Sequence, residues 1–112
     1  MIENQFTYRI LGSQSWDAHD DNIDVEVTLP SGERYAATFF TKNNINTLFK
    51  KYTSTGECKS GLYVWSSNMI IVNKIDKDTI IEIIDDMLKC KEFTAAFQRL
   101  SQERGQGQER GA

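Results

Sequence analysis

The sequence Ile23–Tyr52, IDVEVTLPSGERYAATFFTKNNINTLFKKY, predicts a strand, a turn, a second strand and a helix, in that order. Apolar and polar residues alternate from Ile23 to Leu29, which is typical of a strand with one buried face. Pro30–Glu33 has the composition of a tight turn, because proline presets φ and glycine accepts a positive φ. The return strand, Arg34–Phe40, is apolar on both faces, which favours a central or covered position. A hairpin is therefore expected here.

A short helix is expected after this hairpin. Thr41 suits the N-cap, because its hydroxyl can accept a hydrogen bond from a backbone N–H of the first turn. Gly56 marks the expected end of the helix. One helix face carries the apolar residues Ile45, Leu48, Phe49 and Tyr52.

The rest of the chain supplies further elements. Phe6–Leu11 reads as a first strand. Leu62–Trp65 and Met69–Val72 have strand composition and flank a turn, so they are expected to form a second hairpin. Asp76 can cap a strongly amphipathic helix that contains Ile80, Ile84 and Leu88, and residues 92–100 are expected to form either a short separate helix or an extension of this one.

These elements predict one small α+β domain over residues 1–100, with a mostly antiparallel sheet of about five strands and two to three helices packed on it. Residues 101–112 contain Gln-Glu-Arg-Gly twice and almost nothing to bury, which predicts a disordered polar tail. No apolar run approaches the roughly 20 residues that span a bilayer, and the first residues lack a signal-peptide pattern. We expect a cytoplasmic protein with Cys58 and Cys90 as reduced thiols.

Charge is unevenly distributed, although the net charge is only −3. The segment from Gly12 to Glu33 contains six acidic residues, one histidine and no lysine or arginine. Such a segment attracts a basic partner, or it is simply a solvated loop and strand face; both interpretations remain open. Trp16, in the same segment, is expected to fold back onto the core, with an exposed contact as the alternative.

Catalytic and metal-binding patterns are weak. His19 has acidic neighbours, but the chain has no second histidine and the loop does not match a calcium-binding pattern. Cys58 and Cys90 lack the surroundings of a catalytic cysteine, and no glycine-rich phosphate loop is present. The sequence therefore predicts neither an enzyme nor a metal site, and it implies no cofactor.

Nucleic-acid binding is a weaker alternative to protein binding. Tyr63 and Trp65 on one side of a strand could stack on bases, with Lys50, Lys51 and Lys59 near phosphates. The chain is acidic overall, and alternating aromatic residues are also typical of a core strand. Core packing is the expectation for both aromatic side chains.

Several stretches resemble a recurrent pattern in small bacterial proteins. They are Asp24–Thr41, Thr55–Cys58, Gly61–Trp65 and Met69–Val72. Proteins with this pattern resemble immunity proteins of bacterial toxin systems, including contact-dependent growth inhibition. The resemblance covers residues 16–97, and it offers no catalytic motif to compare.

The resemblance implies an inhibitor that binds the toxic C-terminal domain of a secreted protein made by the same cell. Many such toxins are nucleases with basic clefts, which an acidic surface can cover. The contacts expected on this basis are Trp16, Asp17, Asp20, Asp21, Asp24 and Glu26. The resemblance implies neither a nucleic-acid nor a membrane partner. An adaptor domain that binds another intracellular protein is the main alternative.

Overall fold

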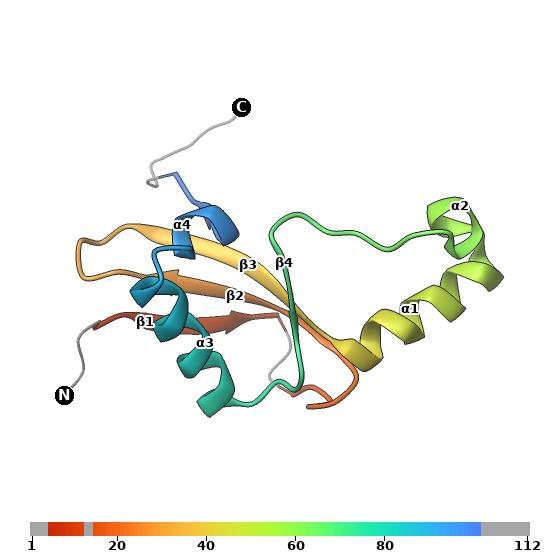
Figure 1. Cartoon of the computed structure of the whole chain (residues 1–112), viewed down its shortest axis with the longest axis horizontal. Coiled ribbons are helices and arrows are strands. Elements are labelled where there is room, and N and C mark those ends of the chain that lie inside the picture. Colours follow the sequence, from red (N-terminus) through yellow and green to blue (C-terminus); the bar gives the residue numbers. More distant parts are fainter. Residues whose placement is uncertain (1–4, 13–14, 102–112) are drawn as a thin grey trace.

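A computed structural model describes residues 5–12 and 15–101, which form an α+β domain (Figure 1). The sheet is mostly antiparallel, as expected, and four helices accompany it. The predicted polar tail, apart from Ser101, lies outside the described residues. The elements in chain order are β1 (Thr7–Leu11), β2 (Asn22–Thr28), β3 (Arg34–Thr41), α1 (Lys42–Thr55), α2 (Glu57–Gly61), β4 (Met69–Val72), α3 (Lys77–Lys89), α4 (Phe93–Ala96) and β5 (Gln98–Arg99).

β3 is the central strand of the sheet, as its two apolar faces predicted. Residues 34–40 of β3 pair antiparallel with β2, which pairs in turn with β1. Two shorter strands share its other edge. β5 pairs antiparallel with Tyr35 and Ala36, and β4 pairs parallel with Thr38–Thr41.

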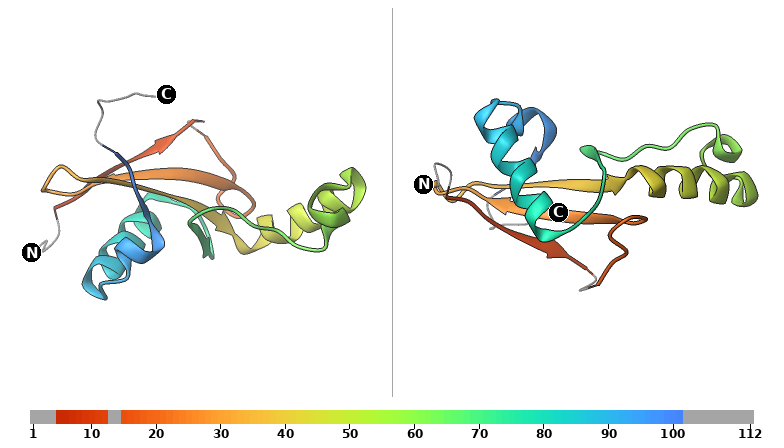
Figure 2. Two further views of the ribbon diagram at one scale, coloured as in Figure 1. Left: turned by 90° about the horizontal axis from the view of Figure 1, so that it is seen from above. Right: turned by 60° about the horizontal axis from the view of Figure 1, so that its bottom comes forward.

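One face of the sheet carries the core. Strand register aligns Ile23 with Phe39, Val25 with Ala37 and Val27 with Tyr35, so alternate residues of β2 and β3 share this face. α3 and α4 pack over it, and no helix of the described chain crosses the opposite face (Figure 2). The buried residues from the helices and from the two connections beside them are Ile75, Ile80, Ile84, Phe93 and Phe97.

The predicted second hairpin is wrong. Leu62–Trp65 is not a strand, and Met69–Val72 pairs with β3 instead, in parallel. Parallel neighbours require a crossover connection, and residues 42–68 provide it. Of the two arrangements expected for residues 92–100, the structure has the short separate helix. It is limited to α4, and β5 follows it.

α1 begins and ends at the predicted residues. The Thr41 hydroxyl accepts a hydrogen bond from the Asn44 N–H at 3.1 Å, and Gly56 closes the helix with a φ of 87°. Because α1 follows directly from the end of β3, it extends beyond the sheet rather than packing across it (Figure 2). Residues 42–68, which comprise α1, α2 and the segment returning to β4, are called the arm below.

Candidate protein-binding surfaces

The acidic loop, residues 15–21, folds back on itself through its own carboxylates. Asp17 Oδ1 accepts a hydrogen bond from the His19 N–H at 2.9 Å. Asp21 Oδ2 accepts one from the Asp17 N–H at 3.0 Å. These Asx-type contacts hold the loop in a defined conformation and keep three exposed or half-exposed carboxylates close together.

The acidic loop is attached to the base of the arm. Asp20 accepts hydrogen bonds from Asn44 Nδ2 at 3.1 Å and from Thr47 Oγ1 at 2.9 Å. The Asp21 N–H donates to Thr41 Oγ1 at 3.2 Å, and Thr41 is fully buried. A single hydroxyl therefore caps α1 and fixes the end of the acidic loop.

Replacing Thr41 with valine is expected to lower the free energy of unfolding by about 1–2 kcal/mol, because two backbone N–H groups lose their acceptor. Urea unfolding would measure the change. Thr47→Val is the matched control, since it removes one exposed hydrogen bond to Asp20, and a change within about 0.5 kcal/mol is expected. Equal effects for both variants would contradict the role assigned to Thr41.

Trp16 lies against the core rather than standing out from the loop. Its Nε1–H donates to the Ile75 carbonyl at 2.9 Å, and its half-buried ring packs against the core cluster. This is the arrangement expected of a tryptophan that folds back. The side chain ties the acidic loop to the connection that leads into α3.

Glu26 and Asp24 lie on the face of the sheet opposite α3 and α4. Glu26 is only 6% exposed and lies between Arg9 and Arg34, with N–O distances of 3.1 and 3.0 Å. Asp24 Oδ1 accepts a hydrogen bond from Thr38 Oγ1 at 2.7 Å. The structure thus separates Glu26, in a cross-strand ion cluster, from the exposed carboxylates of the acidic loop.

Burial by itself would raise the pKa of Glu26, but hydrogen bonds from Arg34 and Arg9 outweigh it and hold the pKa below the ordinary carboxyl value. A lowered folded-state pKa stabilises the fold fully above the unfolded-state pKa. This contribution is lost as pH falls through the folded-state pKa.

Glu26→Gln is therefore expected to lower the free energy of unfolding at neutral pH, by about 1–2 kcal/mol. The difference from the wild type should hold down to the ordinary carboxyl pKa of 4.5 and shrink below it. Chemical unfolding between pH 7 and pH 3 would measure this. A difference that stays constant down to pH 3 would show that the arginines do not lower this pKa.

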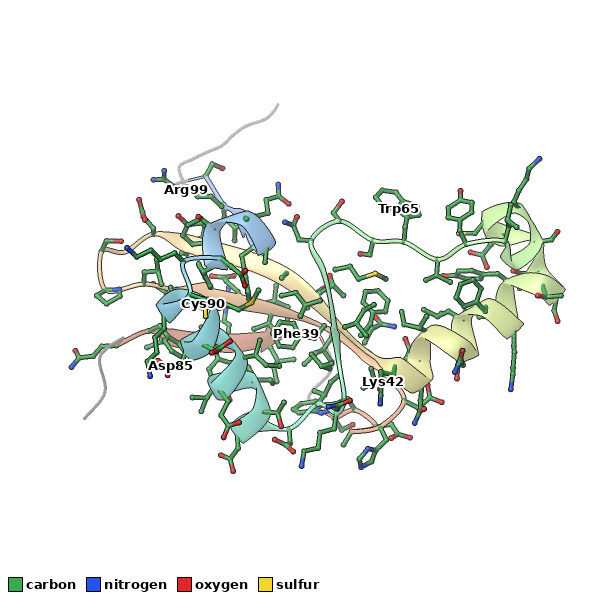
Figure 3. All side chains as sticks on the ribbon, in the orientation of Figure 1. Phe39, Lys42, Trp65, Asp85, Cys90 and Arg99 are labelled. Atoms are coloured by element: carbon green, nitrogen blue, oxygen red, sulfur yellow. The ribbon has the colours of Figure 1, made fainter. Side chains whose placement is uncertain are left out.

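The arm exposes large apolar side chains. The exposed fraction is 73% for Leu62, 48% for Tyr63 and 66% for Trp65. All three lie on the segment that runs from α2 back to β4 beside α1, and Figure 3 shows the Trp65 side chain there, far from Phe39 in the core. The expectation that Tyr63 and Trp65 pack in the core is wrong, because their segment never joins the sheet.

A close contact fixes where the chain reverses in the arm. Gly61 has a φ of 82°, and a Cβ there would lie 2.8 Å from the Phe49 carbonyl oxygen and 2.7 Å from Thr53 Oγ1. Only glycine fits so near the helix backbone. The preceding residues Cys58, Lys59 and Ser60 also have positive φ, which is costly for residues with a Cβ. The tight reversal brings the exposed segment back along α1.

The acidic loop and the exposed aromatic segment lie on opposite sides of α1 (Figures 1 and 2). They also differ in charge. The arm carries four lysines and one glutamate, a net charge of +3, whereas the acidic loop carries three aspartates. The structure thus joins two unlike surfaces through the first turns of α1.

Among residues 5–12 and 15–101, no three histidine, cysteine or carboxylate side chains are grouped closely enough to hold a metal ion. Cys58 and Cys90 are free thiols. Within the same ranges, no helix has the length and apolar composition needed to cross a bilayer.

Comparison of the chain with protein-family models, curated protein sequences and solved structures found no match.

Proposed function

We propose that this chain is a protein-binding inhibitor of the immunity type, and that the arm is its principal contact surface. Its partner would be the toxic C-terminal domain of a secreted bacterial protein made by the same cell. The resemblance implies that this domain is a nuclease. Binding would neutralise that domain by covering its active site or another essential surface. The observation that carries the proposal is the exposure of Leu62, Tyr63 and Trp65 together on the arm.

Exposed aromatic side chains support a protein partner. Tryptophan and tyrosine are enriched among the residues that contribute most to binding energy, because each buries a large apolar area and has few rotatable bonds. Grouped exposure of such residues is uncommon in a monomer without a partner. The strained reversal at residues 58–60 presents this segment on α1, which reduces the ordering required on binding.

The acidic loop supports a second, electrostatic contact. Hydrogen bonds fix the conformation of the loop that carries Asp17, Asp20 and Asp21. The three carboxylates therefore produce their negative electrostatic potential before the partner binds. Such a surface favours association with a basic cleft and repels acidic surfaces. The two free thiols suit action in the reducing cytoplasm.

Growth rescue is the direct test. The C-terminal domain encoded immediately upstream would be expressed in a bacterial host with the wild-type chain, with a Tyr63→Ala/Trp65→Ala variant, or without either. Rescue by the wild type and a stable complex of the purified proteins are expected. Persistent toxicity despite expression of the folded wild-type chain would contradict inhibition of that domain. The adaptor alternative would then be favoured.

A second candidate, single-stranded RNA binding, is favoured by one observation. Tyr63 and Trp65 are exposed on an arm whose Lys50, Lys51 and Lys59 are also exposed. Stacking and phosphate contacts require this combination. Titration with a labelled oligonucleotide at two salt concentrations distinguishes the candidates. RNA binding should weaken steeply with salt and disappear in Trp65→Ala, whereas the inhibitor proposal predicts no specific RNA complex.

A further inference from the structure

A groove lies between β4 and α3, on the opposite side of β4 from β3. It is a hollow of about 470 Å³. One stripe of α3 forms its helical wall, since residues 79, 82, 83, 86 and 87 recur at helical spacing. Ile70 and Val72 contribute from the strand, and Ile83 and Met87 contribute from the helix. The floor of the groove is therefore apolar.

Within residues 5–12 and 15–101, no strand pairs with the edge of β4 that faces this groove. β4 is the last strand of the path β1-β2-β3-β4, and β3 is its sheet neighbour. The Asn68 carbonyl accepts a hydrogen bond from the Thr38 N–H of β3 at 3.0 Å. Because successive residues of a strand direct their backbone groups to opposite edges, those of Met69 and Ile71 face away from β3. Ile71 is 57% exposed and helps to line the groove.

Negative charge surrounds the groove. Glu82, Asp86 and Glu92 line it, and no lysine or arginine does. Among residues 5–12 and 15–101, none of these three carboxylates forms an ion pair, whereas the neighbouring Asp85 pairs with Lys89. The groove thus combines an apolar floor, a free strand edge and uncompensated acidic side chains.

We propose that this groove binds an extended, basic peptide segment by adding a strand to the edge of β4. Backbone hydrogen bonds to Met69 and Ile71 would supply affinity, as in other strand-addition complexes. Alternate lysine or arginine side chains would lay their alkyl stems on Ile70, Ile83 and Met87, with their charged ends at the carboxylates. The site lies on a different part of the fold from the arm and does not depend on the proposed inhibitor function.

A second copy of the chain fits this edge poorly. Pairing of two β4 edges about a twofold axis would bring the α3 helices to the same face of a continuous sheet. Glu82 and Asp86 of both copies would then lie across the junction, where like charges repel. Charge complementarity therefore selects a basic segment over self-association.

A blocked octapeptide that alternates threonine and arginine is the probe, and the same peptide with glutamate in place of arginine is its control. We expect the basic peptide to shift the backbone amide NMR signals of residues 69–72 and 79–87, and the acidic peptide to leave them unchanged. Of two basic peptides N-methylated at either the threonines or the arginines, one should lose binding, because only one edge of the added strand pairs with β4.

The carboxylates are tested by Glu82→Gln with Asp86→Asn, which should weaken peptide binding by about fivefold or more. Asp17→Asn with Glu57→Gln is the matched control, because it changes net charge equally at exposed sites outside the groove. Equal weakening in both variants would overturn the proposal. So would unchanged β4 signals with the wild type, or a concentration-dependent dimer whose β4 amides are protected without peptide.

Discussion

Replacing Trp65 with alanine is expected to weaken binding of the partner protein by about thirtyfold or more, a loss of about 2 kcal/mol or more. The indole is 66% exposed in the free chain, so a complex that covers the arm would bury most of its surface. The reduction should appear mainly as faster dissociation, because the lost contact is apolar and does not guide the encounter. Isothermal titration calorimetry and surface plasmon resonance would measure both quantities.

The same substitution should leave the free energy of unfolding nearly unchanged, because the side chain is already in water. Ile81→Ala is the matched control, since Ile81 is an exposed apolar residue, 42% exposed, on α3 rather than on the arm. It should bind like the wild type. If Leu62→Ala and Trp65→Ala both retained full affinity, the arm would not be the contact surface, and the acidic loop would become the first region to map.

Phe93→Ala is expected to produce the largest loss of stability, about 3–5 kcal/mol. Phe93 is 1% exposed in the four-residue helix α4. Its ring contacts Tyr35 edge-on, with centroids 5.0 Å apart, and stacks on Phe97 with centroids 4.3 Å apart. Removing it leaves a cavity at the junction of β3, α4 and β5, which such a short helix cannot close by itself.

Guanidinium unfolding would measure this loss, and Thr94→Ala is its control, because Thr94 is exposed in the same helix. A change within about 0.5 kcal/mol is expected for the control. A small effect of Phe93→Ala would mean that the segment from α4 to β5 contributes little to folding. That result would contradict its place in the core, where Phe97 also packs edge-on against Phe39.

Local pattern predicted much of the fold. The alternation over Ile23–Leu29, the turn at Pro30–Glu33 and the cap at Thr41 all correspond to observed features. Each depends on residues close in sequence, where backbone preferences and side-chain hydrogen bonds act directly. The start of the helix after Asp76 is also determined locally, because the Asp76 carboxylate accepts a hydrogen bond from the Thr79 N–H.

The candidate surfaces were less predictable. Tyr63 and Trp65 alternate as they would in a core strand, yet both are exposed. The acidic segment around Glu26 indicates a solvent-exposed side chain. In the structure Glu26 is nearly buried between two arginines from neighbouring strands. Alternation indicates which side chains share a face, but it does not indicate whether a segment joins a sheet or what covers each face.

The strands, turns and helices with strong local signals follow from the amino-acid sequence alone, and so does the α+β class. Three features emerge only from the folded chain: β4 pairs in parallel with β3, the arm projects from the domain, and an acidic groove lies between β4 and α3. Strands that are distant in sequence can each pair with several apolar partners, and these pairings compete. The outcome depends on how the intervening chain can cross and on which combination buries the most apolar surface.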